Sequence, residues 1–213
     1  MRKVLYFDCF SGISGDMTIA ALLDTGISLE WLESQLLKLH VEQKYELKLN
    51  KVIKNGINSN HFDVIFEEAS DHHDHKHETD HHTHHHRTYK DIVQMIENSE
   101  LNESVKTMAL DMFRVIGEAE AKIHGIDLDH VHFHEVGAID SIIDIVGVAI
   151  LIDHLGIDQI ISSPVPVGSG HIHIDHGIYP VPAPATLEIL KDIPIKNTKV
   201  VGGNDNTNRC SYY

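Results

Sequence analysis

The sequence predicts an α/β fold, with α+β as the alternative, in which helices pack on a mixed sheet. Two observations support this prediction. Alternating apolar runs typical of strands are interspersed with helical runs along the chain. The 213 residues are 42% hydrophobic and 23% charged, which is sufficient for a core of normal size. Residues 71–86, in contrast, contain no apolar side chain, so we expect a disordered His-rich insert over 70–87.

The first third of the chain predicts one strand, two helices and a hairpin. The run KVLYFDCF indicates a strand over 3–10, and a short helix over 17–26 stops at Gly26. A helix over 28–39 follows, with Ser28 as its N-cap and a leucine stripe formed by Leu29, Leu32, Leu36 and Leu39. Two alternating runs within 45–68 flank Asn55-Gly56, a strong hairpin signal.

The remainder predicts four helices and one further strand. Helices are expected over 88–99, 102–125, 138–156 and 181–192, and a strand over 159–168. Gly156 ends the third of these helices, and prolines begin the fourth. One face of the second helix carries an apolar stripe that predicts core packing: Val105, Met108, Met112, Val115, Ala119 and Ile123.

The net charge of the chain argues against some classes of binding partner. Asp plus Glu number 32 against 17 Lys plus Arg, a net charge of −15. No basic patch stands out, which argues against nucleic acid and against an anionic membrane surface. The N-terminus does not resemble a signal peptide, and no stretch approaches a membrane span. Cys9 and Cys210 lie far apart, a pattern typical of a reducing compartment, so we expect a cytoplasmic protein.

The His-rich insert, DHHDHKHETDHHTHHH, predicts metal capture, because neutral imidazole suits Zn²⁺, Ni²⁺, Cu²⁺ or Co²⁺. The alternative is a solvated loop whose histidines have no function. Affinity order alone does not name the metal, since copper ranks above nickel. The insert's candidate ligands are nine of the nineteen histidines in the chain: His72, His73, His75, His77, His81, His82, His84, His85 and His86.

A second cluster, DHVHFHEVGAIDSIID, combines nitrogen and oxygen ligands around a predicted strand-to-helix turn. In an extended segment, residues at alternate positions project to the same side. Two carboxylates four residues apart share one face of a helix that starts near Ala138. The alternative is a polar loop followed by helix-capping acids. The candidate metal ligands here are His130, His132, His134, Asp140 and Asp144.

Two further stretches could contribute to the same site. GSGHIHIDHG carries His171, His173 and His176 between glycines, which allow close approach of a ligand to the backbone. The loop DCFSGISGDM could present backbone N–H groups to a phosphate, but it lacks the lysine of a Walker A motif. The alternative for this loop is a tight turn with Asp16 as a helix N-cap. Its candidate cofactor-binding residues are Asp8, Ser11, Gly12, Gly15 and Asp16.

In these motifs the chain resembles the nickel-insertion proteins of nickel-pincer cofactor biosynthesis, the LarC family. The matching stretches run from residue 5 to about 203: YFDCFSGISGDM, the His-rich insert, HFHEVGAIDSIIDIVG, SPVPVGSGHI and HGIYPVPAPATLEIL. HFHEVGAIDS and PVPAPATLE are the most specific of these. Residues 1–203 would accordingly be the nickel-binding N-terminal domain of the family.

The resemblance implies a substrate, a reaction and partners. The substrate would be a pyridinium mononucleotide that bears two thiocarboxylates, and Ni²⁺ would be inserted to give a sulfur–carbon–sulfur pincer. A C-terminal domain would bind CTP with Mn²⁺ or Mg²⁺, and the class would be a lyase or cyclometallase. His134 or Glu135 would be the base that takes the ring proton. The product would serve a nickel-dependent racemase, as in lactate racemase maturation, and self-association is left open.

Two other functions compete with nickel insertion. A non-catalytic nickel or zinc storage or delivery chaperone would need only the His-rich insert. A metal-dependent hydrolase would use a metal-bound water at the cluster between His130 and Asp144.

The tail GGNDNTNRCSYY is polar and departs from the family, in which a segment like TPTGAA leads into a second domain. Reading the codons after Gly203 one nucleotide later can encode that segment. We therefore expect a +1 ribosomal frameshift near 201–203, either programmed or a break in the gene model. Residues 204–213 should then be disordered, and the short chain should bind nickel but insert it poorly alone. The genomic DNA tests this expectation, which fails if the +1 frame does not encode the segment.

Overall fold

The structure is a computed structural model that describes residues 2–66, 87–133, 136–174 and 177–202. Its helices are α1 (Gly15–Leu23), α2 (Leu29–Leu36), α3 (Tyr89–Glu97), α4 (Glu103–His124), α5 (Ile139–Leu155) and α6 (Pro184–Ile189). Short 3₁₀ turns, η1 (Leu37–Leu39) and η2 (Leu128–His130), follow α2 and α4. Its strands are β1 (Val4–Phe7), β2 (Tyr45–Lys54), β3 (Ile57–Phe66), β4 (Arg87–Thr88), β5 (His132–Phe133), β6 (Gln159–Ser162), β7 (Val165–Ile174), β8 (Gly177–Pro180) and β9 (Ile195–Gly202).

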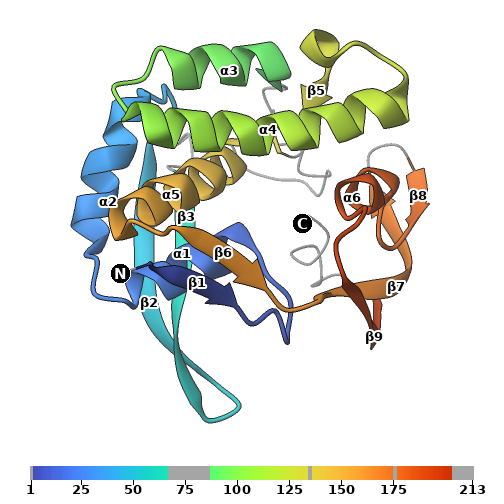
Figure 1. Ribbon diagram of the computed structural model, residues 1–213, viewed down its shortest axis with the longest axis horizontal. Helices are drawn as coiled ribbons and strands as arrows, with labels where there is room; N and C mark the ends of the chain where they lie inside the picture. The colour runs from blue at the N-terminus through green and yellow to red at the C-terminus, as the bar shows by residue number, and fades with distance from the viewer. Residues whose placement is uncertain (1, 67–86, 134–135, 175–176, 203–213) are drawn as a thin grey trace, which may run out of the picture.

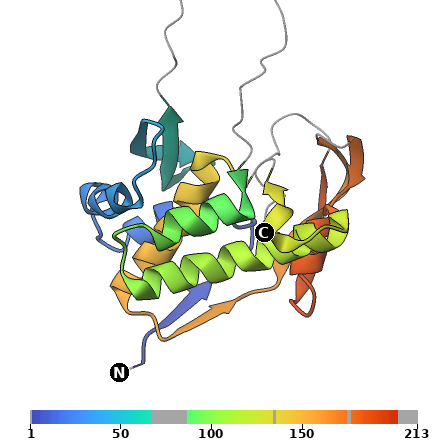
Figure 2. The ribbon, with the colours of Figure 1, turned by 90° about the horizontal axis from the view of Figure 1, so that it is seen from above.

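The α/β class is confirmed, but the described strands form four small sheets instead of one. β1 and β6 pair in parallel, while β2–β3 and β4–β5 pair antiparallel. The order β8-β7-β9 makes the mixed sheet, antiparallel on one side of β7 and parallel on the other. Figure 1 shows the layers, with α3 and α4 outermost, α5 beneath them, and β1 and β6 at the opposite side of the molecule. In Figure 2, α3 and α4 run side by side over this arrangement.

Helix α5 is the centre of the core. It packs against α1, α2 and α4, so side chains around most of its circumference are buried. This burial explains why its sequence is almost continuously apolar and lacks a polar stripe. Helices α1 and α5 lie close together at Gly147, where a Cβ would be 3.0 Å from the Cδ1 atom of Ile19. The largest fully buried side chains come from helices α1 to α5, strand β3, the turn η1 and the residue before β5: Phe62, Phe113, Ile19, Leu32, Leu36, Leu39, Ile92, Ile96, Ile142, Ile143, Leu151 and Val131.

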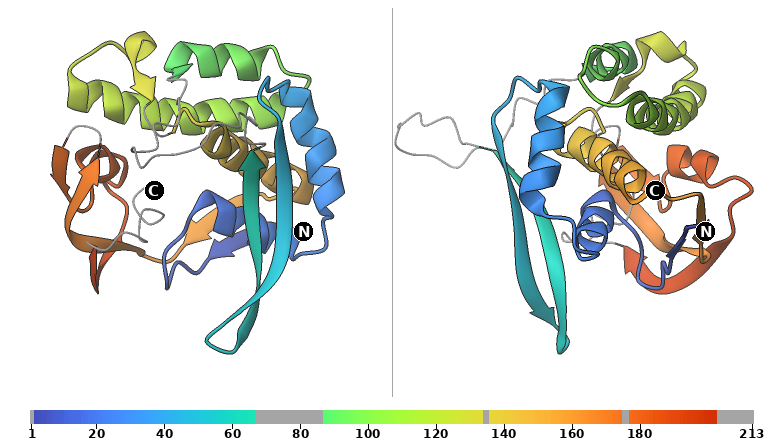
Figure 3. Two further views of the ribbon diagram at one scale, coloured as in Figure 1. Left: turned by 180° about the vertical axis from the view of Figure 1, so that it is seen from behind. Right: turned by 60° about the vertical axis from the view of Figure 1, so that its left-hand side comes forward.

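The β2–β3 hairpin has the turn that its sequence predicts. Asn55 and Gly56 have φ values of 51° and 79°, the left-handed pair required by a type I′ turn. The base of the hairpin is anchored by buried Leu47 and Phe62. The tip extends away from the body in both views of Figure 3, and Ile53 near the turn is 75% exposed.

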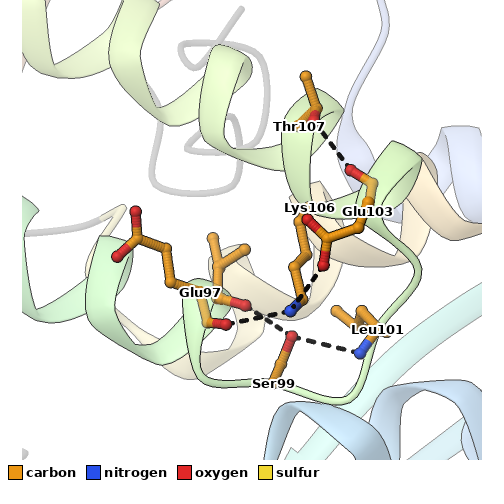
Figure 4. A network of polar contacts seen from close by, with 7 residues as sticks. Glu97, Ser99, Leu101, Glu103, Lys106 and Thr107 are labelled. Carbon is orange, nitrogen blue, oxygen red and sulfur yellow. Dashed lines mark hydrogen bonds and ion pairs between the residues drawn. The ribbon is translucent and has the colours of Figure 1, made fainter.

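A compact polar network closes the turn between α3 and α4 (Figure 4). The Lys106 ammonium donates to the Glu97 carbonyl at 3.0 Å and lies 3.2 Å from the Glu103 carboxylate. The Leu101 N–H donates to the Ser99 hydroxyl oxygen at 3.4 Å. These contacts satisfy polar groups at the end of α3 and the start of α4, which lets the two helices fold back on each other.

Several sequence predictions are confirmed locally. Ser28 caps α2, its hydroxyl accepting the Trp31 N–H at 3.2 Å, and three of the four predicted stripe leucines are buried. Gly125 and Gly156 end α4 and α5 in the left-handed conformation. A proline begins α6, as expected.

The predicted single strand over 159–168 is wrong. Residues 163–164 separate two strands instead: β6, which pairs with β1, and β7, which belongs to the mixed sheet. Pro164 has no N–H to donate to a ladder, so one continuous paired strand is interrupted there.

The predicted stripe on α4 is also partly wrong. Val105 and Ala119 are buried as expected, but Val115 and Ile123 are 47% and 40% exposed. The buried row continues instead through Ala109 and Phe113, because packing against both α3 and α5 selects the residues spaced by four.

Within the described ranges, no helix is both long enough and apolar enough to cross a membrane.

Candidate functional site

The residues that follow the insert histidines pair with the first two residues of the HFHEVG motif in a short two-stranded ladder. Strand β4, at the C-terminal end of the insert, pairs antiparallel with β5, so that Arg87 is opposite Phe133 and Thr88 is opposite His132. The Tyr89 N–H extends the contact by donating to the Val131 carbonyl at 2.9 Å. The insert's nine histidines lie outside the described residues, but the segment that follows them is held beside β5.

The turn after β5 is held by two contacts that the sequence analysis missed. The Arg87 guanidinium donates to the Gly137 carbonyl at 3.0 Å. A Cβ at Gly137 would lie 2.8 Å from the Phe133 carbonyl oxygen, so only glycine fits without a shift. Phe133 and Gly137 therefore lie close together beside Arg87, while His134 and Glu135 lie outside the described ranges.

A capping box at the start of α3 supports the same ladder. The Asp91 N–H donates to the Thr88 hydroxyl at 3.2 Å, and the Thr88 N–H donates to the Asp91 carboxylate at 2.9 Å. The Thr88 hydroxyl also donates to this carboxylate, and these bonds lower the Asp91 pKa below its usual value. The pattern TYKD directly after the insert is the signal that could have found this box.

The second cluster is not a continuous extended segment. His130 is the last residue of the 3₁₀ turn η2, and His132 belongs to β5. Both side chains are exposed. The expected alternation from His130 through His134 is therefore interrupted at its first member, because the preceding turn curls the backbone.

The two predicted carboxylates do share helix α5, which begins at Ile139 after the N-cap residue Ala138. Asp140 is exposed, and its carboxylate accepts the Ser141 N–H at 2.8 Å. Asp144 is half-buried and lies directly against the start of α1. A Cβ at Gly15 would be 2.5 Å from the Asp144 Cβ and 2.7 Å from its Oδ2. The structure therefore brings Asp144 together with the loop DCFSGISGDM.

That loop is a tight turn from β1 into α1. The Gly12 N–H donates to the Cys9 carbonyl at 3.0 Å, and Gly12 has a φ of 101° that favours glycine. The expectation of Asp16 as N-cap is wrong. Ser14 is the cap, its hydroxyl accepting the Met17 N–H at 3.4 Å and donating to the Asp16 carboxylate. Asp8 and Ser11 are exposed in the same turn, and Gly15 is buried.

The third cluster forms the β7–β8 hairpin. His171 is exposed and pairs with Pro180, and the backbone of His173 pairs with Ile178. The His173 side chain and all of His176 lie outside the described parts. The connection between β6 and β7 contacts the β1–α1 loop, because the Cys9 N–H donates to the Ser163 hydroxyl at 2.9 Å.

Taken over the described part of the chain, no three His, Cys, Asp or Glu side chains gather where they could hold a metal ion. Of the predicted site residues, His134, Glu135, His176 and the nine histidines of the insert lie outside that part. The described geometry thus supplies two local arrangements. One is the β4–β5 ladder beside the insert, and the other is the loop with Asp144.

The comparisons with known proteins agree on one family. The family described as "Nickel insertion protein" matches residues 5–208. Proteins called "Pyridinium-3,5-bisthiocarboxylic acid mononucleotide nickel insertion protein" from Clostridium kluyveri and Geobacillus kaustophilus are 55% and 54% identical, over 193 and 195 residues. Each alignment covers 91% of this chain, and 48% and 46% of the relatives.

A relative of the same name from Staphylococcus epidermidis is 48% identical over 200 residues. No solved structure matches the chain. The chain spans about half the length of the curated relatives it matches. Its match to the family over nearly its whole length, together with more than half identity to two relatives, places the chain in the nickel insertion protein family.

Proposed function

We propose that this chain takes up Ni²⁺ and acts in its insertion into pyridinium-3,5-bisthiocarboxylic acid mononucleotide, the substrate in its relatives' names. One structural observation carries the proposal for this chain. The β4–β5 ladder fastens the end of the His-rich insert beside His132, at the strand that leads to His134 and Glu135. A metal collected by the insert would therefore be released next to the ordered ligands.

The proposed transfer follows ligand chemistry. Many overlapping histidines raise the local nickel concentration without holding the ion in one place. A smaller set of ligands, drawn from His130, His132 and His134 with Asp140 or Asp144, would receive it. The softer thiocarboxylate sulfurs of the substrate would then compete for nickel against the harder imidazole and carboxylate ligands.

Formation of the nickel–carbon bond needs a base. The carbon–hydrogen bond of the ring breaks, its electron pair goes into the bond to Ni²⁺, and the proton must leave. His134 or Glu135 would accept that proton, since both follow β5 directly. No change of oxidation state is needed, so the step requires no external oxidant or reductant.

The loop residues Asp8, Ser11, Gly12, Gly15 and Asp16 would hold the mononucleotide. Asp144 would help to shape this loop, because the missing side chain at Gly15 lets its carboxylate reach the start of α1. CTP, with Mn²⁺ or Mg²⁺, would bind to the second half that the relatives possess, and a nickel-dependent racemase would consume the product. The reaction class would be that of a lyase or cyclometallase.

The test is a reconstitution read by mass spectrometry. The chain is mixed with Ni²⁺, the precursor and CTP, with and without the C-terminal half of the Clostridium kluyveri relative. A nickel adduct of the precursor in the supplemented mixture supports the proposal, and its absence from both mixtures contradicts it.

A pair of variants separates insertion from storage. Replacing all nine insert histidines with serine keeps the length of the segment and removes its ligands. An insertion protein should then lose activity at limiting nickel and regain it at high nickel, whereas a pure store should not recover. His134→Ala should abolish insertion at both nickel levels, and His124→Ala, at the end of α4 beside Glu120, is the matched control.

A further inference from the structure

The side chain of Phe10 is exposed to solvent at a turn whose backbone is held by hydrogen bonds. It is 76% exposed, although the preceding residue, Cys9, is only 2% exposed. The backbone is fixed on both sides of the ring. The Cys9 N–H donates to Ser163, and the Gly12 N–H donates to the Cys9 carbonyl. A single exposed phenylalanine is ordinary in itself, but here the ring is presented by a turn with little freedom to withdraw it.

A cationic side chain lies over one face of the Phe10 ring. The Lys196 ammonium lies 5.6 Å from the centroid of the Phe10 ring, within the range of a cation–π interaction. Lys196 belongs to β9 and pairs with Pro166 of β7. The ring therefore lies where the β1–α1 loop meets the β7–β9 sheet, between two of the clusters that the sequence singles out.

The substrate named for the relatives has features that match this pair. A pyridinium ring is both aromatic and positively charged, so it gains from stacking on a phenyl ring and from the negative potential of its face. Its thiocarboxylate and phosphate groups are anionic, so they favour an ammonium close to the ring.

We propose that Phe10 and Lys196 form the platform that recognises the pyridinium ring, an inference that rests on the proposed function. The open face of Phe10 stacks on the pyridinium. Lys196 is exposed, so its long side chain can turn past the edge of the Phe10 ring, where the ammonium pairs with an anionic substituent of the pyridinium. Phe10 is then a specificity-determining residue for cationic rings, and the neighbouring loop residues hold the rest of the mononucleotide.

The experiment uses three commercially available probes with the intact chain, and isothermal titration calorimetry measures their dissociation constants. Nicotinic acid mononucleotide has a pyridinium ring with a carboxylate. Nicotinamide mononucleotide has the same ring with a neutral amide, and uridine monophosphate has an uncharged ring. Phe10→Leu keeps an apolar side chain but removes the aromatic face, while Phe10→Trp enlarges it. Tyr6→Leu is the matched control, because Tyr6 is an aromatic residue of β1 that is 59% exposed.

We expect Phe10→Leu to weaken both pyridinium probes about tenfold and to leave uridine monophosphate unchanged. Phe10→Trp should bind the pyridinium probes at least as tightly as the native chain, and Tyr6→Leu should have no effect. Lys196→Met should weaken only the carboxylate probe, by about threefold to tenfold. Circular dichroism confirms that each variant is folded.

The platform is refuted if the native chain does not prefer the pyridinium probes, or if Phe10→Leu and Tyr6→Leu behave alike. Either result leaves nickel insertion to be judged by its own assay. Conversely, a chain that binds the pyridinium probes through Phe10 but yields no nickel adduct would contradict only the proposed function.

Discussion

Substituting Gly15 with alanine tests how closely α1 and α5 approach at the candidate site. The new Cβ would lie 2.5 Å from the Asp144 Cβ and 2.7 Å from its Cγ. Rotating the Asp144 side chain would move its Cγ but not its Cβ, because the Cβ is attached directly to the backbone of α5. One helix must shift.

The expected cost comes from two opposing effects. Alanine is better than glycine within a helix by at most about 1 kcal/mol, and this gain is smaller at the first helical residue. Overpacking of this kind costs about 1–3 kcal/mol. We therefore expect a net loss of about 1–2 kcal/mol in the free energy of unfolding, or roughly 2–8 °C in Tm. Urea denaturation followed by circular dichroism measures it.

Gly147→Ala is the matched control. Its Cβ would meet only the Cδ1 end of Ile19, at 3.0 Å, so a small side-chain adjustment suffices and the helix gain offsets the contact. Asp144→Ala in the Gly15→Ala background should not restore stability, since the closest atom, the Cβ, remains. Native stability of Gly15→Ala would refute the close approach described for these helices.

Two further predictions concern contacts around the site. Thr88→Ala should lose about 1 kcal/mol of stability and weaken nickel binding, because the capping box supports the β4–β5 ladder. The control Ser28→Ala removes the α2 cap, so it should lose similar stability without weakening nickel binding. Equal losses of nickel affinity in the two variants would contradict this prediction. Hydrogen bonds from Lys122 and Lys191 lower the Glu188 pKa below its ordinary value of 4.5. Because the folded-state pKa is the lower one, this contribution is present above pH 4.5 and lost as pH falls through the folded value. Glu188→Gln should therefore weaken the dependence of the free energy of unfolding on pH in the acid range. An unchanged dependence would show that the link between α4 and α6 is too weak to matter.

Local features of the sequence determined much of the fold. The Asn55-Gly56 turn, the Ser28 cap and the glycines after α4 and α5 each depend on one or two neighbouring residues, and the structure has all of them where expected. The motifs that identify the family are also contiguous, so they could be recognised without any knowledge of packing.

Other features were decided by contacts between distant segments. The buried face of α4 depends on which helices flank it, and the division of 159–168 depends on which strands β6 and β7 pair with. The same is true of the site. Nothing in the sequence placed Asp144 against Gly15, Arg87 across from Phe133, or Lys196 over Phe10. Each pair is separated by many residues, so its proximity arises from the packing of α5 on α1, the β4–β5 ladder and the β7–β9 register, which no local pattern encodes.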